Sequence, residues 1–295
     1  DEASSSELNS ERRFMHDRIQ HAAYSLLDEA TKREVDLAIG KQLLNSLSPS
    51  EQHERIFDIV NQSNLGFASS QDSNDRLRFA ELNLIAAKQA RSSAAYSSAA
   101  SYLEAAMVCL PADKWEAHYE LSKQIFEQRA HCEAMLHNFA VAEGYLKELA
   151  SHTAESHIRA RLYVDMLDIY YSIHANQRAI DLGLQALAEF GLHFPPTESE
   201  RAALVVPSFE RLQKSLQGRA IRDLADLPAA TDQTQMELMH LMLTLGTVSY
   251  AIAPMLFQLL SVETILINIK YGHNHVSAYA YSCYGVMVLG AFNDR

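Results

Sequence analysis

The chain carries 13 histidines, so histidine-rich segments are the first candidates for chemistry. His131, Glu133 and His137 lie within HCEAMLH, and His273 and His275 are close together further along. A zinc-protease helix needs the order HExxH, which places two histidines on one face. His131 and His137 are six residues apart, about 600° around a helix, and therefore point to different sides. We expect no metal site.

Nucleotide chemistry has no motif in this sequence. It contains no GxxxxGK[ST] loop, no GxGxxG after a strand, and no kinase catalytic loop or DFG element. The order His16-Asp17-Arg18 is wrong for the kinase loop and falls in a helical pattern. No general acid and base pair can be placed by spacing either. We therefore expect that this chain is not an enzyme and holds no cofactor.

The composition predicts an all-α fold and argues against nucleic-acid binding. Of 295 residues only 10 are Gly and 7 Pro, while Ala and Leu, both strong helix formers, are abundant. The net charge of -12 has the wrong sign for a surface that follows phosphates. Cys109 and Cys132 are far apart and without a CxxC partner, so we expect small core residues in a reducing compartment.

The amino end reads DEASSSELNSERR and lacks the apolar run of a secretory signal. We expect residues 1–11 to be a disordered lead and the protein to be cytoplasmic. Because the chain has no initiator Met, we also expect it to be a piece of a longer protein.

The uncharged run from Leu238 to Val262 is long enough to cross a bilayer. Pro254 divides it into two halves of ordinary helix length, so we expect two buried helices and no membrane span.

Past residue 70 the apolar pattern repeats. Each repeat places three small or apolar residues at offsets of 0, 4 and 7 on the second helix of a pair. The first residues of successive triplets, which we call register points, are 43 and then 37 residues apart. The sequence predicts antiparallel helix pairs that stack to remove their apolar faces from water. The prolines of GLHFPPTESERAALVVPS predict an irregular joint over 191–208. The repeated triplets are Ala99, Leu103 and Ala106, then Ala142, Leu146 and Leu149, then Ala179, Gly183 and Ala186.

The segment AYSSAASYLEAAMVCLP resembles a tetratricopeptide repeat, which implies a TPR-like α-solenoid. FMHDRIQHAAYSLL, ERIFDIVNQSNLG and IKYGHNHVSAYAYSCYGVMVLGAFND, in this order, resemble the region after the ATPase module in large bacterial signalling kinases. Those proteins combine a serine/threonine-kinase-like domain, a STAND-type AAA ATPase, helical repeats, a GAF sensor and a histidine kinase. The resemblance implies that residues 12–70 are the helical, winged-helix-like tail of the ATPase lobe. Residues 71–295 would then be repeats truncated at their carboxyl end, and His16 could lie near ADP in the intact protein.

A helical solenoid offers one distinctive surface, the concave face formed by the first helix of each pair. We expect it to dock a protein partner, or another domain of the same chain, and to relay ATPase or sensor state to kinase output. An alternative is a ligand sensor, in which the apolar pair from Leu238 to Ile269 encloses a small amphiphilic signal or a peptide. The residues expected to line the groove are Glu81, Lys88, Arg91, Gln124, Glu127, His131, Arg161, Asp168 and Tyr171.

Overall fold

The computed structural model describes residues 22, 24–66 and 72–292, and in that part of the chain the fold is all-α. The predicted disordered lead and His16 lie outside the described residues. The chain divides into two compact units, Asp1–Cys132 and Glu133–Arg295. The predicted boundary at residue 70 stays a prediction.

The first unit begins with three helices that pack through close backbone contacts. Asp28 caps the start of helix α2, and its carboxylate accepts from the Thr31 backbone N–H at 2.9 Å. Helices α3 and α4 are separated at Arg55, whose φ of -106° and ψ of 24° lie outside the usual helical values. Ser48 and Glu51 form a capping box, which satisfies free N–H groups at the start of the short leading helix. The helices are α2 (Glu29–Ser46), α3 (Pro49–Glu54) and α4 (Ile56–Gly66).

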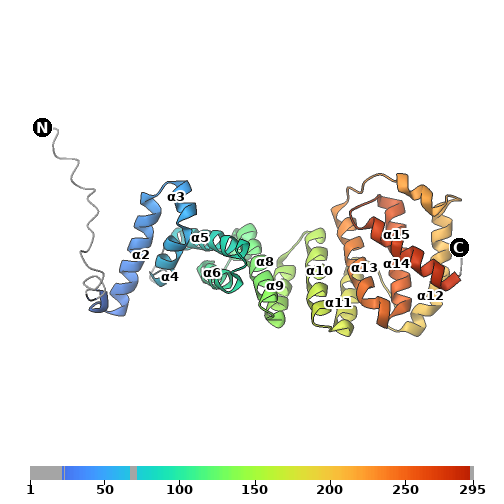
Figure 1. The fold of residues 1–295 in the computed structure, drawn as a ribbon, viewed down its shortest axis with the longest axis horizontal. Coiled ribbons are helices and arrows are strands. Elements are labelled where there is room, and N and C mark those ends of the chain that lie inside the picture. The colour runs from blue at the N-terminus through green and yellow to red at the C-terminus, as the bar shows by residue number, and fades with distance from the viewer. Residues whose placement is uncertain (1–21, 23, 67–71, 293–295) are drawn as a thin grey trace. The chain divides into compact units, whose positions relative to one another are not determined.

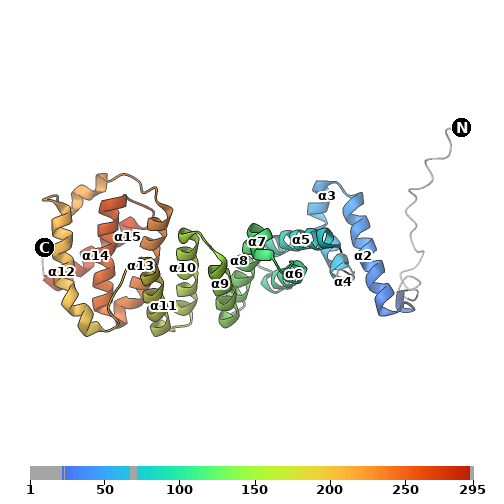
Figure 2. The same cartoon turned by 180° about the vertical axis from the view of Figure 1, so that it is seen from behind.

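The rest of the first unit contains a helix pair, α5 and α6, that runs side by side (Figures 1 and 2). Two further helices, α7 and α8, are separated at His118, whose ψ of 41° leaves the helical range. The bounds are α5 (Ser73–Ser92), α6 (Tyr96–Cys109), α7 (Lys114–Ala117) and α8 (Tyr119–Met135).

Helix α8 runs past the division at Cys132, and the second unit continues with α9 to α15. In this unit α13 packs against α10, α11 and α14, and α12 packs against α14 (Figure 1). The bounds are α9 (Phe139–His152), α10 (Ser156–Ser172), α11 (Asn176–Glu189), α12 (Glu198–Leu216), the 3-10 helix Ile221–Asp226, α13 (Gln233–Ile252), α14 (Pro254–Tyr271) and α15 (Ser277–Phe292).

The same turn geometry ends three of the described helices, α5, α8 and α10, and it recurs at the spacing of the predicted repeat. Ala94, His137 and His174 adopt positive φ values of 57°, 62° and 57°. Each next residue donates its N–H to a carbonyl five positions back, at 3.0, 2.8 and 2.9 Å, which closes the end of the first helix. The three turns are 43 and then 37 residues apart, like the predicted register points. All nine residues of the repeated triplets are buried.

The second position of the triplets shows why the repeat is degenerate. Leu103 and Leu146 are buried in the first two hairpins, and Gly183 takes the same place in the third. A Cβ on Gly183 would lie 2.6 Å from Cδ1 of Leu245, which comes from α13. The leucine of the neighbouring helix therefore occupies the space that a side chain at position 183 would fill.

The apolar run from Leu238 to Val262 forms two helices, as predicted. Helix α13 ends at Ile252, and Pro254 is the first residue of α14, where its missing N–H costs nothing. Side chains of both helices, including Leu241, Leu245 and Leu260, are fully or almost fully buried in the core of the second unit. Among the described residues, no helix combines the length and hydropathy that a bilayer crossing requires.

The expectation that residues 191–208 stay irregular is wrong for the second half of that segment. Helix α12 starts at Glu198 and continues through Pro207. A capping box between Thr197 and Glu200 starts the helix, and burial of Leu212 and Leu216 holds it against α14. A proline inside a helix costs about 3 kcal/mol, whereas each buried leucine contributes about 1.5–3 kcal/mol, so packing outweighs the proline.

Candidate functional site

Two kinds of feature are candidate binding sites: polar helix faces, described separately for each unit, and a cavity beside α12 in the second unit. Six of the nine predicted groove residues lie in the first unit and three in the second. The structure places all nine on helices, and each has an exposed or half-buried side chain.

In the first unit, predicted residues of α5 and α8 lie together. The Lys88 ammonium donates to the Gln124 side-chain oxygen at 2.7 Å. Partial burial, together with the positive charge of Arg91, lowers the pKa of His131, whose ring lies 6.2 Å from that of Tyr96. Glu127 lies between Gln124 and His131 on the same face of α8. Glu81 pairs with Arg78 of its own helix at 3.1 Å.

In the second unit, Arg161, Asp168 and Tyr171 present polar groups on α10, and Tyr171 is 49% exposed. Tyr170, the next residue back, is buried, and its hydroxyl donates to Glu143 at 2.6 Å. Tyr171 is therefore exposed where its neighbour Tyr170 is buried, and its role in a groove stays a prediction.

Helix α13 brings further titratable groups to Arg161 and Asp168. His240 and Glu237 form an ion pair of 3.7 Å, which raises the pKa of His240 and lowers that of Glu237. Asp168 and Asp165 also raise the pKa of His240, while Arg161 lowers that of Glu237. Desolvation by nearby protein atoms raises the pKa of Asp168, although its side chain keeps exposed surface.

Sequence analysis missed Asp165, Glu237, His240 and His275 as members of this cluster. The His275 ring lies 5.7 Å from the His240 ring and meets it edge to face. The spacing of Glu237 and His240 by three residues within one predicted helix was a readable signal of a local pair. The proximity of Glu237 and His240 to α10 could not be predicted from the sequence, because it brings together residues about 70 positions apart. In the described part of the chain, no group of three or more His, Cys, Asp or Glu side chains could hold a metal ion.

The two buried cysteines, Cys109 and Cys132, are core residues as predicted. Burial raises the pKa of the Cys109 thiol to about 11. A thiol with such a pKa is almost entirely protonated near neutral pH and is therefore a poor nucleophile.

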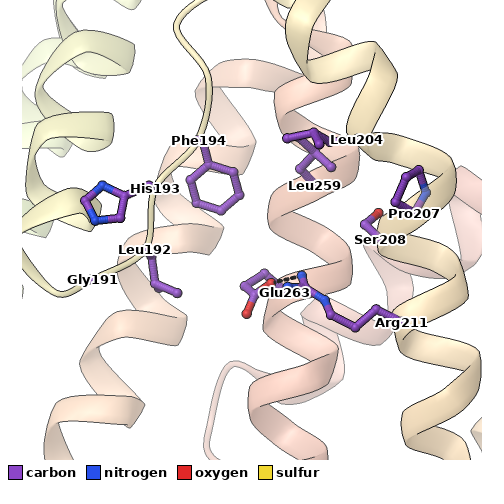
Figure 3. Close-up of a pocket in the computed structure, with 10 residues that line it drawn as sticks. All are labelled: Gly191, Leu192, His193, Phe194, Leu204, Pro207, Ser208, Arg211, Leu259 and Glu263. Atoms are coloured by element: carbon purple, nitrogen blue, oxygen red, sulfur yellow. Dashed lines mark hydrogen bonds and ion pairs between the residues drawn. The ribbon is translucent and has the colours of Figure 1, made fainter.

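The second candidate site is a cavity of about 450 Å³ bounded by the loop after α11, by α12 and by α14 (Figure 3). Phe194 and Leu259 lie on opposite sides of it, and Arg211 reaches across from α12 to an ion pair with Glu263 of α14. His193 points away from Phe194, to the other side of the loop (Figure 3). The lining residues are Gly191, Leu192, His193, Phe194, Leu204, Pro207, Ser208, Arg211, Leu259 and Glu263.

A buried arginine holds the loop that forms one wall of this cavity. Arg201 is 3% exposed and donates to the carbonyl oxygens of Pro195 and Pro196 at 2.7 and 2.9 Å. It also pairs with Glu198 at 2.7 Å, and Glu198 accepts from the backbone N–H of Met255 at 2.9 Å. The loop is thereby tied both to the start of α12 and to the first turn of α14.

Sequence analysis did not find the cavity and placed the alternative ligand site inside the pair from Leu238 to Ile269. Many side chains of that pair fill the core, and only Leu259 and Glu263 of α14 line the cavity. The sequence TESE at Thr197–Glu200 was the available signal, because Thr followed three residues later by Glu marks a helix start.

Comparison with known proteins gives one informative match. The chain is 28% identical over 170 residues to hybrid signal transduction histidine kinase G of Dictyostelium discoideum. The match covers 49% of this chain and 5% of that protein. No protein-family model and no solved structure matches the chain. The chain is thus similar to a short stretch of a much longer histidine kinase.

Proposed function

We propose that this chain is a non-catalytic relay segment of a cytoplasmic multidomain signalling kinase or ATPase. Its helix pairs form a TPR-like solenoid, preceded by the tail of an ATPase lobe, and dock a protein partner or another domain of the same chain. The repeated hairpin turn at Ala94, His137 and His174 carries this proposal, because equivalent hairpins are the building unit of stacked repeats. The similarity to a hybrid histidine kinase supports the signalling context.

The docking surfaces in this proposal are polar helix faces, one on α5 and α8 in the first unit and one on α10 and α13 in the second unit. Lys88 and Gln124 are linked on α5 and α8, and Arg161 and Asp168 of α10 lie near the charged pair of α13. Both signs of charge are present, which favours a partner with a matching charge pattern over a uniformly charged polymer.

The test is a pull-down in which this chain captures the other domains of the parent protein. The unchanged chain is compared with the double variant Arg91→Glu, Arg161→Glu. Both side chains retain solvent access, so the reversal leaves the core intact. We expect at least about tenfold weaker capture at low salt and a smaller difference at high salt, because interface charges act through screened attraction. The matched control is Arg222→Glu, since Arg222 is 89% exposed in its side chain and is not a groove residue. Unchanged capture and unchanged kinase output in the double variant would remove the support for the groove.

A second candidate function is small-molecule sensing, and the cavity beside α12 favours it. Its volume of about 450 Å³ falls within the roughly 300–1,000 Å³ usual for ligand sites. Native mass spectrometry of the purified chain distinguishes the two functions. A co-purified small molecule supports sensing. If no small molecule co-purifies and the chain still captures the other domains, docking is supported.

A further inference from the structure

The cavity beside α12 has one apolar part and one charged part. Phe194, Leu204 and Leu259 supply apolar surface (Figure 3). At the other end Arg211 of α12 and Glu263 of α14 form an ion pair between two helices. A molecule that fits this site therefore needs an apolar body and a charged head.

The two charged side chains differ in exposure. The Glu263 side chain is 16% exposed, whereas that of Arg211 is 58% exposed. A purely anionic head would draw Arg211 away and leave the more buried carboxylate without its cation, which is costly. A purely cationic head would bind Glu263 and displace the guanidinium. A head that carries both charges can pair with both groups at once.

We propose that this cavity binds a small zwitterion with an apolar body, of the class of apolar α-amino acids. The ligand carboxylate binds the Arg211 guanidinium, whose planar fork suits a carboxylate. The ligand ammonium binds Glu263, and the apolar side chain lies against Phe194 and Leu259. The inference rests on the second candidate function, small-molecule sensing, and gives that function a ligand class.

The wall that contacts the ligand is held in place before binding. Arg201 fixes the carbonyls of Pro195 and Pro196, and Glu198 joins the same network to the start of α14. Pre-ordering reduces the loss of entropy on binding, because the loop that carries Phe194 is already tied down. The volume of about 450 Å³ accommodates one amino acid together with several waters of roughly 30 Å³ each.

The test is isothermal titration of the purified chain with L-leucine and L-phenylalanine. Four related probes separate the parts of the ligand: N-acetyl-L-leucine lacks the ammonium, L-leucinamide lacks the carboxylate, glycine lacks the apolar body, and octanoate is an anionic amphiphile. We expect leucine or phenylalanine to bind with a Kd of about 1 mM or tighter. We expect each of the four probes to bind at least about tenfold more weakly.

Variants tie the binding to the cavity. Arg211→Gln and Glu263→Gln should each weaken leucine binding at least about tenfold, and Arg211→Lys should weaken it by less, because a single charge remains. Arg222→Gln, an equivalent change at an exposed arginine that does not line the cavity, should leave it unchanged. The urea midpoint of each variant, measured alongside, shows whether the second unit is still folded.

The possible failures are distinguishable. If octanoate or N-acetyl-L-leucine binds as tightly as leucine and depends on Arg211, the cavity is a ligand site and the zwitterion class is wrong. If binding of leucine is unaffected by Arg211→Gln and Glu263→Gln in folded protein, the site lies elsewhere. If none of the six probes binds, this inference is overturned, and native mass spectrometry decides separately whether the sensing function fails with it.

Discussion

The close approach of α11 and α13 at Gly183 gives the sharpest test of the packing. In Gly183→Ala the new methyl group meets Leu245, whose Cδ1, Cδ2 and Cγ atoms would lie 2.6, 2.8 and 3.1 Å away. Leu245 is fully buried and has little room to change rotamer. Overpacking costs about 1–3 kcal/mol, while replacing a mid-helix glycine by alanine gains about 1 kcal/mol. We therefore expect a net loss of up to about 2 kcal/mol in the free energy of unfolding.

A matched control exists in the same unit. Gly144 lies inside α9, and a Cβ there would meet nothing within 4 Å. Gly144→Ala should therefore stabilise the second unit by about 0.5–1 kcal/mol through helix propensity alone. Both glycines belong to the second unit, so one urea unfolding transition reports on both variants.

A double-mutant cycle isolates the contact. Leu245→Ala alone should cost about 2–5 kcal/mol, because it leaves a cavity in the core. In that background the new methyl group has space, and Gly183→Ala should become stabilising by about 1 kcal/mol. The coupling energy between positions 183 and 245 should therefore be about 1–3 kcal/mol. If Gly183→Ala stabilises the otherwise unchanged chain as much as Gly144→Ala does, the argument from close packing is refuted.

Three further predictions concern single groups. The raised pKa of His240 stabilises the fold below the unfolded pKa near 6.5, and this stability is lost as pH rises through the folded pKa, whereas the lowered pKa of Glu237 stabilises the fold above about pH 4.5. His240→Gln should therefore lower the free energy of unfolding by about 0.5 kcal/mol near pH 5.5–6 and by almost nothing above pH 8, as measured by urea titration. A loss of stability that grows with pH would contradict this assignment. Tyr170→Phe removes the 2.6 Å hydrogen bond to buried Glu143 and should cost about 1.5–3 kcal/mol by urea unfolding, whereas a neutral result would mean that water replaces the hydroxyl. Pro207→Ala restores a helical N–H in α12 and should increase the free energy of unfolding by about 1–3 kcal/mol, which raises the thermal midpoint by a few degrees. A lower midpoint would show that the proline is required for packing.

The sequence by itself determined the all-α class, the three recurring turns and the buried residues of the repeated triplets. A period of 3.6 residues and the spacing of small residues are local properties, so they can be read along the chain. Ala99, Ala142 and Ala179 are the clearest cases, since each was placed by its offset alone and each is fully buried. The polar faces of α5, α8 and α10 follow from the same periodicity.

Only the tertiary structure decided which distant groups meet. Helix α12 continues through Pro207 because contacts with α14 outweigh a local preference, and no window of sequence contains both helices. The approach of His240 to Asp168, the exclusion of a side chain at Gly183 by Leu245, and the cavity between Arg211 and Phe194 all depend on how helices stack. Stacking is fixed by the summed packing of many side chains, which the periodicity of a single helix does not encode.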